Sequence, residues 1–195
     1  MNVARTCMLG LLALPLAAQS TDFSVGGALI YGLDSYKKAV NSTTGLTLNL
    51  GYDTAVYKSG IPARITFGVG LMPGKERNGL KTSLTLFQLA GDLLIQTDVP
   101  GLRGVFGLSV NSYSARFSGY ESPAVFDADH HFPFRDAKGL KGGLRLGVEY
   151  AFTTRWSGQA LLQATELAGR QRYDPLIRQG GINPSWLEFG ARYKF

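Results

Sequence analysis

From residue 22 onward, apolar and polar side chains alternate along most of the chain with a period of two. Such alternation is typical of β-strands whose two faces meet different surroundings. The last segment shows the pattern most clearly, because all of its charges lie on one face. The apolar face carries Leu187, Phe189, Ala191, Tyr193 and Phe195. The opposite face carries Trp186, Glu188, Gly190, Arg192 and Lys194.

Seven further segments repeat this alternation. They lie near residues 23–33, 46–53, 64–71, 81–96, 102–110, 140–152 and 159–165. A transmembrane β-strand needs about 9–11 residues, which is close to the length of these segments. No helical pattern separates them. The sequence therefore predicts an all-β fold, an eight-stranded antiparallel up-and-down β-barrel that spans a membrane.

A few large apolar side chains interrupt the polar face of this pattern. They are Ile30, Leu84, Leu86, Val105 and Leu161. For Leu84 and Leu86 we expect either a bulge or an apolar plug near that end of the strand.

Alternation alone does not say which face points outward, since soluble lipocalin-like barrels turn their apolar face inward. The composition of the polar face favours a membrane barrel with a polar lumen. Glycines there alternate with long charged residues, as at Gly143, Arg145, Gly147 and Glu149, and the interior of an eight-stranded barrel is only just wide enough for side chains. Buried charges must pair, so we expect the charges of 140–152 to meet those of the last segment, and Arg64 to meet Asp92. The predicted lumen charges are Arg64, Asp92, Arg145, Glu149, Glu188, Arg192 and Lys194.

Aromatic residues and connection lengths also favour a membrane barrel. Aromatic side chains gather at segment ends, as in interfacial girdles; they are Phe23, Tyr31, Tyr52, Phe152, Trp156, Tyr193 and Phe195. If the mature N-terminus is periplasmic, the external connections are 34–42, 73–79, 117–138 and 169–183. The other connections, at 54–61, 97–101 and 153–155, are mostly shorter. Long outer loops and short periplasmic turns are the asymmetry expected of outer-membrane barrels.

The first residues have the pattern of a secretory signal peptide. Arg5 precedes an apolar stretch from Cys7 to Leu16, and Ala17 and Ala18 supply small residues for cleavage. We predict a signal peptide at residues 1–20, cleaved near 18–20, and a barrel domain at 21–195. Cys7 is the only cysteine, so the mature chain is expected to lack disulfides and cysteine metal sites.

Composition excludes two other classes of protein. Aromatic residues make up 11% of the chain and charged residues 17%, unlike an intrinsically disordered chain. The 25 glycines have no period of three, unlike collagen. Many of them fall on the polar strand faces, where a crowded lumen needs small residues.

The formal net charge is +6, but the charges are dispersed, and we expect no nucleic-acid partner.

The C-terminal strand, from Leu187 to Phe195, and the run from Gly147 to Phe152 resemble strands of small outer-membrane barrels of the OmpA, OmpX and opacity-protein type. This resemblance implies a cell envelope protein in the outer membrane of a Gram-negative bacterium. It also implies that the outer-membrane assembly machinery recognises the terminal strand through Leu187, Phe189, Tyr193 and Phe195. Outer-membrane lipids and lipopolysaccharide are implied partners. Unlike full OmpA, the sequence continues into no periplasmic domain after Phe195.

The only histidines lie in the longest predicted loop, beside two aspartates. Asp127, Asp129, His130 and His131 form a cluster of a type that binds metals, although a solvated loop tip explains them equally simply and is the interpretation we prefer. With Ser122 nearby, a lipid-modifying enzyme is one alternative, but no spacing defines a catalytic site. We expect no enzymatic activity and no cofactor.

The predicted external loops carry the features of a surface that meets other molecules. Their cations are Lys37, Lys38, Lys75, Arg77, Arg170, Arg172 and Arg178, and their aromatics include Tyr120, Phe126, Phe132 and Phe134. Such cations suit anionic head groups or an acidic extracellular ligand, and ordinary solvated loops are the other interpretation. We expect a structural or surface-interaction role with a filled polar lumen; a narrow, porin-like channel is the main alternative.

Overall fold

The structure, a computed structural model, describes residues 22–33, 44–56, 59–74, 76–77, 80–118, 137–165 and 185–195. Within these ranges, no helix is long and apolar enough to cross a membrane. The fold consists of antiparallel strands joined to their neighbours in sequence, as the alternation predicts.

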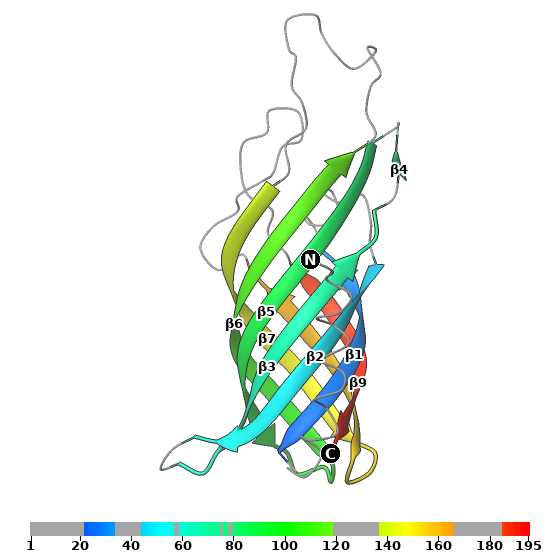
Figure 1. Ribbon diagram of the computed structural model, residues 1–195. Helices are drawn as coiled ribbons and strands as arrows, with labels where there is room; N and C mark the ends of the chain where they lie inside the picture. The colour runs from blue at the N-terminus through cyan, green and yellow to red at the C-terminus, as the bar shows by residue number, and fades with distance from the viewer. Residues whose placement is uncertain are drawn as a thin grey trace, which may run out of the picture.

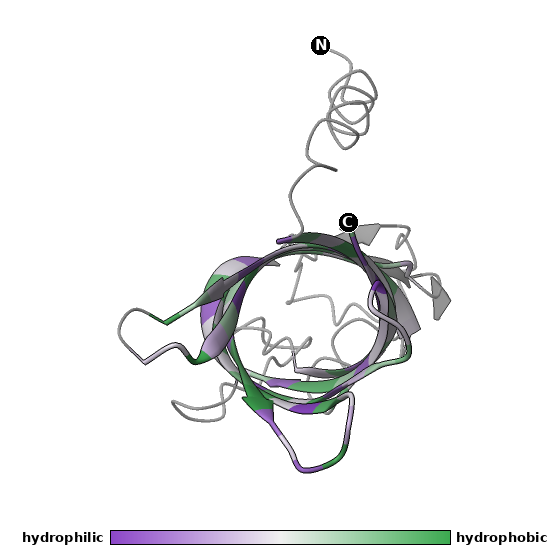
Figure 2. Ribbon diagram, turned by 90° about the horizontal axis from the view of Figure 1, so that it is seen from below, coloured by the Kyte–Doolittle hydropathy of each residue, from purple (hydrophilic) through white to green (hydrophobic). Residues whose placement is uncertain are grey.

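Eight strands close into a barrel (Figures 1 and 2). They are β1 (Phe23–Gly32), β2 (Thr44–Ala55), β3 (Pro62–Met72), β5 (Leu80–Gln96), β6 (Leu102–Ser118), β7 (Ala137–Ala151), β8 (Trp156–Ala164) and β9 (Trp186–Lys194). Each strand pairs with the next, and β9 returns to pair with β1. The two-residue β4 (Glu76–Arg77) pairs only with β5 and lies outside the barrel wall. The predicted eight-stranded up-and-down barrel is confirmed.

The apolar strand faces point outward. Leu48 is 70% exposed and Leu108 is 63% exposed, and both have polar neighbours that point inward. Every one of the eight barrel strands contributes large apolar side chains that are at least half exposed. Among them are Leu29, Leu46, Leu48, Ile65, Phe67, Leu71, Leu89, Leu108, Leu140, Trp156 and Phe189. So large an apolar exterior fits lipid and not water, which confirms the inside-out arrangement.

The apolar residues that interrupt the polar face all point into the lumen. Ile30, Leu84 and Leu86 join Met72, Tyr113, Ala115 and Trp186 in one buried cluster, which we call the apolar plug. Val105 and Leu161 join Leu94 in a smaller cluster. Of the two expectations for Leu84 and Leu86, the plug is correct. The described pairing of β5 with β3 and β6 runs without a bulge.

β6 exceeds its predicted length most, since the sequence pattern covers 102–110 and the strand continues to Ser118. β5 and β6 have 17 residues each and β7 has 15, and β5 and β6 rise above the other strands (Figure 1). The segment predicted at 102–110 stops early because the outward face turns polar at Ser112 and Ser114, while backbone pairing continues to Ser118. The loop expected at 117–138 therefore begins and ends inside strand residues.

The two ends of the barrel differ in the connections that they carry. At one end, which we call the short-turn end, the strands are joined by residues 56–61, 97–101 and 152–155, and the chain ends there at Phe195. The opposite, long-loop end carries the connections 33–43, 119–136 and 165–185. Gly101, with a φ of +81°, makes one of the short turns possible, since few residues other than glycine adopt this conformation.

Aromatic side chains form a belt at the short-turn end. The ring centroids of Phe23 and Tyr52 lie 5.0 Å apart, and those of Trp156 and Tyr193 also lie 5.0 Å apart. Tyr193 also packs edge-on against Phe195 at 5.5 Å. Such a belt is what a membrane interface favours.

Candidate functional site in the barrel lumen

All seven of the predicted lumen charges lie on inward-facing positions. Six of them are at most 5% exposed: Arg64, Asp92, Arg145, Glu149, Glu188 and Arg192. The seventh, Lys194, lies at the rim of the short-turn end, and its side chain is 39% exposed. The barrel thus encloses a charged interior whose groups come from β3, β5, β7 and β9.

The ion pairs among these charges differ from those expected. Arg64 does not pair with Asp92, although the two residues are opposite each other in the β3–β5 register. Its Nε instead donates to Asp53 Oδ1 at 2.6 Å, and its terminal nitrogens donate to Glu149. Asp92 accepts from Arg145 Nε at 2.9 Å. The expected pairing of Arg145 with the charges of β9 is wrong.

A glycine explains why Asp92 pairs with Arg145. The register places Gly107 of β6 directly between these two residues. A Cβ atom at Gly107 would overlap the Asp92 carboxylate. The missing side chain therefore lets an ion pair form across an intervening strand. The same principle applies at Gly143, where a Cβ would overlap the amide of Gln163.

A network of neutral polar groups fills the middle of the lumen. Gln88 Nε2 donates to Asn111 at 2.9 Å and to Gln163 at 3.0 Å. Gln163 Nε2 in turn donates to Ser109 at 2.8 Å. Arg145 also donates to Gln88 and so connects this network to its ion pair with Asp92. Each buried polar group of this kind costs about 1–3 kcal/mol when it is left unpaired, so the network fixes the wall strands in one arrangement.

Glu188 is buried without a cationic partner among the described residues. Its carboxylate instead accepts hydrogen bonds from neutral donors: Gln159 at 2.6 Å, Asn49 at 3.1 Å and Trp186 at 3.5 Å. Since Trp186 belongs to the apolar plug, this contact joins the polar interior to the plug.

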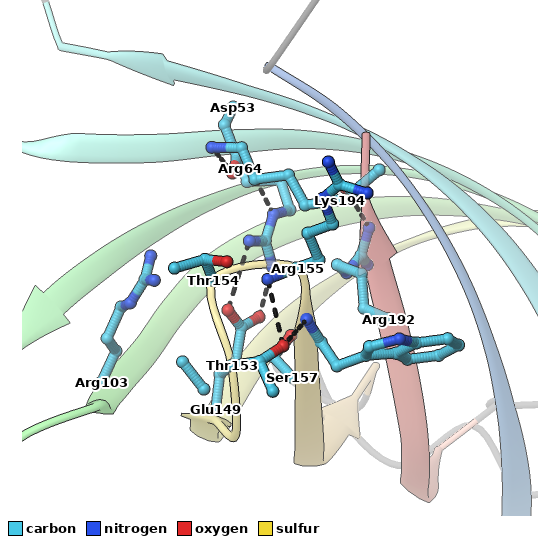
Figure 3. A pocket seen from close by; sticks show the side chains of 13 residues that line it. Asp53, Arg64, Arg103, Glu149, Thr153, Thr154, Arg155, Ser157, Arg192 and Lys194 are labelled. Carbon is cyan, nitrogen blue, oxygen red and sulfur yellow. Dashed lines mark hydrogen bonds and ion pairs between the residues drawn. The ribbon is translucent and has the colours of Figure 1, made fainter. Parts of the chain in front are cut away.

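A small pocket opens at the short-turn end of the lumen (Figure 3). Its charged lining residues are Asp53, Arg64, Arg103, Glu149, Arg155, Arg192 and Lys194. The cavity has a volume of about 30 Å³. Five of these residues are cationic and two are anionic, so the pocket is strongly positive.

Asp53, Gln88 and Gln163 lie on the polar faces of their strands, but the sequence pattern indicated no role for them. Their partners lie on strands far apart in the sequence, so the alternation alone gave no sign of these contacts. Arg103 and Arg155 were also missed, because each lies beside a turn, where the alternation ends.

The predicted metal candidates Asp127, Asp129, His130 and His131 lie outside the described residues. So do the loop aromatics and the loop cations, except Arg77, whose backbone forms part of β4. In the ranges that the structure describes, no group of three or more histidine, cysteine or acidic residues could hold a metal ion.

The four residues of the predicted assembly signal lie on the outward face of the barrel or at its edge. Phe189 is 54% exposed, and Leu187 lies opposite Tyr31 of β1 and Leu162 of β8. Tyr193 and Phe195 belong to the aromatic belt. In the folded barrel β9 is paired on both sides.

Comparison with solved structures identifies the architecture. Neisserial surface protein A matches with a TM-score of 0.57 and 13% identity, over 90% of this chain and 98% of that chain. The fold is that of a small outer-membrane β-barrel. The attachment invasion locus protein Ail of Yersinia pestis matches with a TM-score of 0.52 and 13% identity, over 89% of this chain and 97% of that one. OprG of Pseudomonas aeruginosa matches with a TM-score of 0.52 and 14% identity, over 89% and 95%.

No protein-family profile matches the sequence, and no curated protein is similar to it in sequence. Because the sequence identities to the solved structures are only 13–14%, the similarity to them shows a shared fold. It agrees with the apolar exterior and with the expected location in an outer membrane, where barrels of this kind occur.

Proposed function

We propose that the protein is a non-conducting outer-membrane barrel with a structural or surface-interaction role. The observation that supports this proposal is the filled lumen. The apolar plug occupies the long-loop end, hydrogen-bonded amides occupy the middle, and ion pairs occupy the short-turn end. An eight-stranded barrel has little interior volume beyond that of its side chains, so these layers leave the barrel closed to solutes.

The alternative of a narrow channel requires this interior to rearrange. A solute would have to pass the plug, where Trp186, Met72 and Leu84 are each 1% exposed. It would also have to break the buried pairs of Arg64 and Arg145, and separating such a pair costs about 3–5 kcal/mol. The packing therefore favours a static scaffold over a channel.

The surface-interaction role is supported by the long-loop end. There β5, β6 and β7 continue past the polar outward positions Ser112 and Ser114, so this part of the sheet projects beyond the apolar exterior. We propose that it presents the external loops, with their basic residues, to anionic lipopolysaccharide head groups or to an acidic extracellular ligand. The Ail protein, which has the same fold, has a structure in complex with the heparin analogue sucrose octasulfate.

Three further expectations stay predictions: the signal peptide at 1–20, the absence of enzymatic activity, and recognition of the terminal strand by the assembly machinery. For the last, deletion of Phe195 is expected to impair membrane insertion far more than deletion of Ala128. Heat-modifiable gel mobility of the two variants in isolated outer membranes measures the difference. Equal assembly would contradict the terminal signal.

Solute uptake tests the non-conducting proposal. The barrel is reconstituted in liposomes, and swelling is followed in an isotonic solution of a small sugar, with an open general porin as the positive control. We expect the swelling rate of protein-free liposomes. Swelling that rises with the amount of added barrel would instead show that the sugar passes through it and that the barrel is a channel.

A further inference from the structure

Arg192 is the one buried cation of the short-turn pocket that lacks a carboxylate partner among the described residues. Its residue is 2% exposed. One terminal nitrogen donates to Ser24 Oγ at 3.0 Å, but its Nε has no partner. A buried charge normally needs a counter-charge, so this guanidinium is incomplete as it stands.

The neighbouring carboxylates are already used. Asp53 accepts from Arg64 and pairs with Lys194 at 3.3 Å. Glu149 accepts two hydrogen bonds from Arg64. The pocket therefore holds more cations than its own carboxylates can neutralise, and the excess surrounds Arg192.

Two more arginines add positive charge at the rim of the pocket. Arg103 is half-buried and has no ion pair with the described residues. Arg155 lies in the turn before β8, and its side chain donates to the hydroxyl of Tyr193 at 3.3 Å. Figure 3 shows Arg103 apart from the ion pairs of the pocket. Cations arranged around a concave, partly enclosed opening concentrate anions there.

We propose that this pocket binds a small inorganic anion of halide size, held by the buried guanidinium of Arg192 and attracted by Arg103 and Arg155. The Arg192 guanidinium, which lines the pocket, supplies a charge-assisted hydrogen bond to the anion. Ser157, the register partner of Arg192 on β8, also lines the pocket. The volume of about 30 Å³ is enough for a monatomic ion or a water molecule.

The site also has a structural consequence. Arg192 lies against Gly51, where a Cβ atom would overlap the guanidinium, so the missing side chain of Gly51 provides the space that the guanidinium occupies. A bound anion would complete the charge balance at the end of the lumen that has no plug. The anion site is independent of the role proposed for the external loops.

Bromide tests the site directly, because its anomalous scattering locates it. Crystals of the detergent-extracted barrel are soaked in sodium bromide. We expect an anomalous peak within hydrogen-bond distance of the Arg192 guanidinium, and no such peak in Arg192→Met. Lys138→Gln, which removes an exposed cation at the opposite end of the barrel, serves as the matched control and keeps the peak. A wild-type barrel without a peak in the pocket would overturn the proposal.

A solution measurement covers the case in which Arg192→Met does not fold. Thermal unfolding is followed in sodium bromide and in sodium gluconate at equal ionic strength, since gluconate is a much larger anion than bromide. Wild type and Lys138→Gln are expected to unfold at a higher temperature in bromide, with saturation. Arg103→Gln should raise the half-saturating bromide concentration several-fold. Equal unfolding temperatures in the two salts, or a wild-type response in Arg103→Gln, would count against the site.

Discussion

At the long-loop end of the lumen, the inward side chains are large and apolar, whereas at the short-turn end they are mostly arginines and carboxylates. The plug includes Met72, Leu84 and Trp186. The other end holds Arg64 between Asp53 and Glu149, with the small cluster of Leu94, Val105 and Leu161 nearby. The same eight strands thus enclose two interiors that are stabilised by different interactions.

The difference shows what a narrow barrel requires of its contents. The plug is stabilised by burial of apolar surface and by close packing. The charged end depends on ion pairs and hydrogen bonds, because removal of one partner of a buried ion pair costs several kcal/mol. Removing one side chain should therefore leave a cavity at the plug, but an uncompensated charge at the other end.

The largest effect is expected from Asp92→Asn. This change leaves the Arg145 guanidinium buried beside a neutral group, and the free energy of unfolding should fall by about 3–5 kcal/mol. Denaturant titration of the barrel in micelles measures the loss. The double variant Asp92→Leu with Arg145→Met removes both charges and should recover most of it. A double variant less stable than Asp92→Asn would show that the pair itself is strongly stabilising.

The plug should respond to Leu84→Ala with a loss of about 2–5 kcal/mol, since the substitution opens a cavity among well-packed side chains. Leu89→Ala on the same strand is the matched control, because Leu89 is 56% exposed on the outer face. The same titration should give Leu89→Ala less than half the loss of Leu84→Ala. Similar losses for the two variants would mean that the plug is not tightly packed.

A smaller loss, about 1–3 kcal/mol, is expected from Gly107→Ala, because the added methyl group forces the Asp92 carboxylate to move. Gly91→Ala is the control one strand away, since a Cβ there meets nothing within 4 Å. Urea midpoints of the two variants should differ, with Gly91→Ala close to wild type. Equal midpoints would contradict the steric role of the lumen glycines.

The sequence alone predicted the faces of the strands and offered a plug as one of two expectations for Leu84 and Leu86, but it did not indicate the plug residues Met72 and Tyr113. Ile30 and Leu86 interrupt the alternation, and an apolar residue on an inward face must meet others of its kind. The ion pairs were harder to predict, because they depend on side chains that reach across a strand. Asp92 reaches Arg145 only because Gly107 lies between them. The incomplete pairing of Arg192 depends on which carboxylates Arg64 already binds, and that is a property of the folded lumen.

Single-channel recording in planar lipid bilayers tests the filled lumen most directly. With both ends packed and the middle hydrogen-bonded, the wild-type barrel should insert without producing steady, discrete current steps. An open porin recorded in the same membrane shows that insertion and detection work. Reproducible openings of fixed size from the wild-type barrel would contradict the account of a closed, non-conducting scaffold.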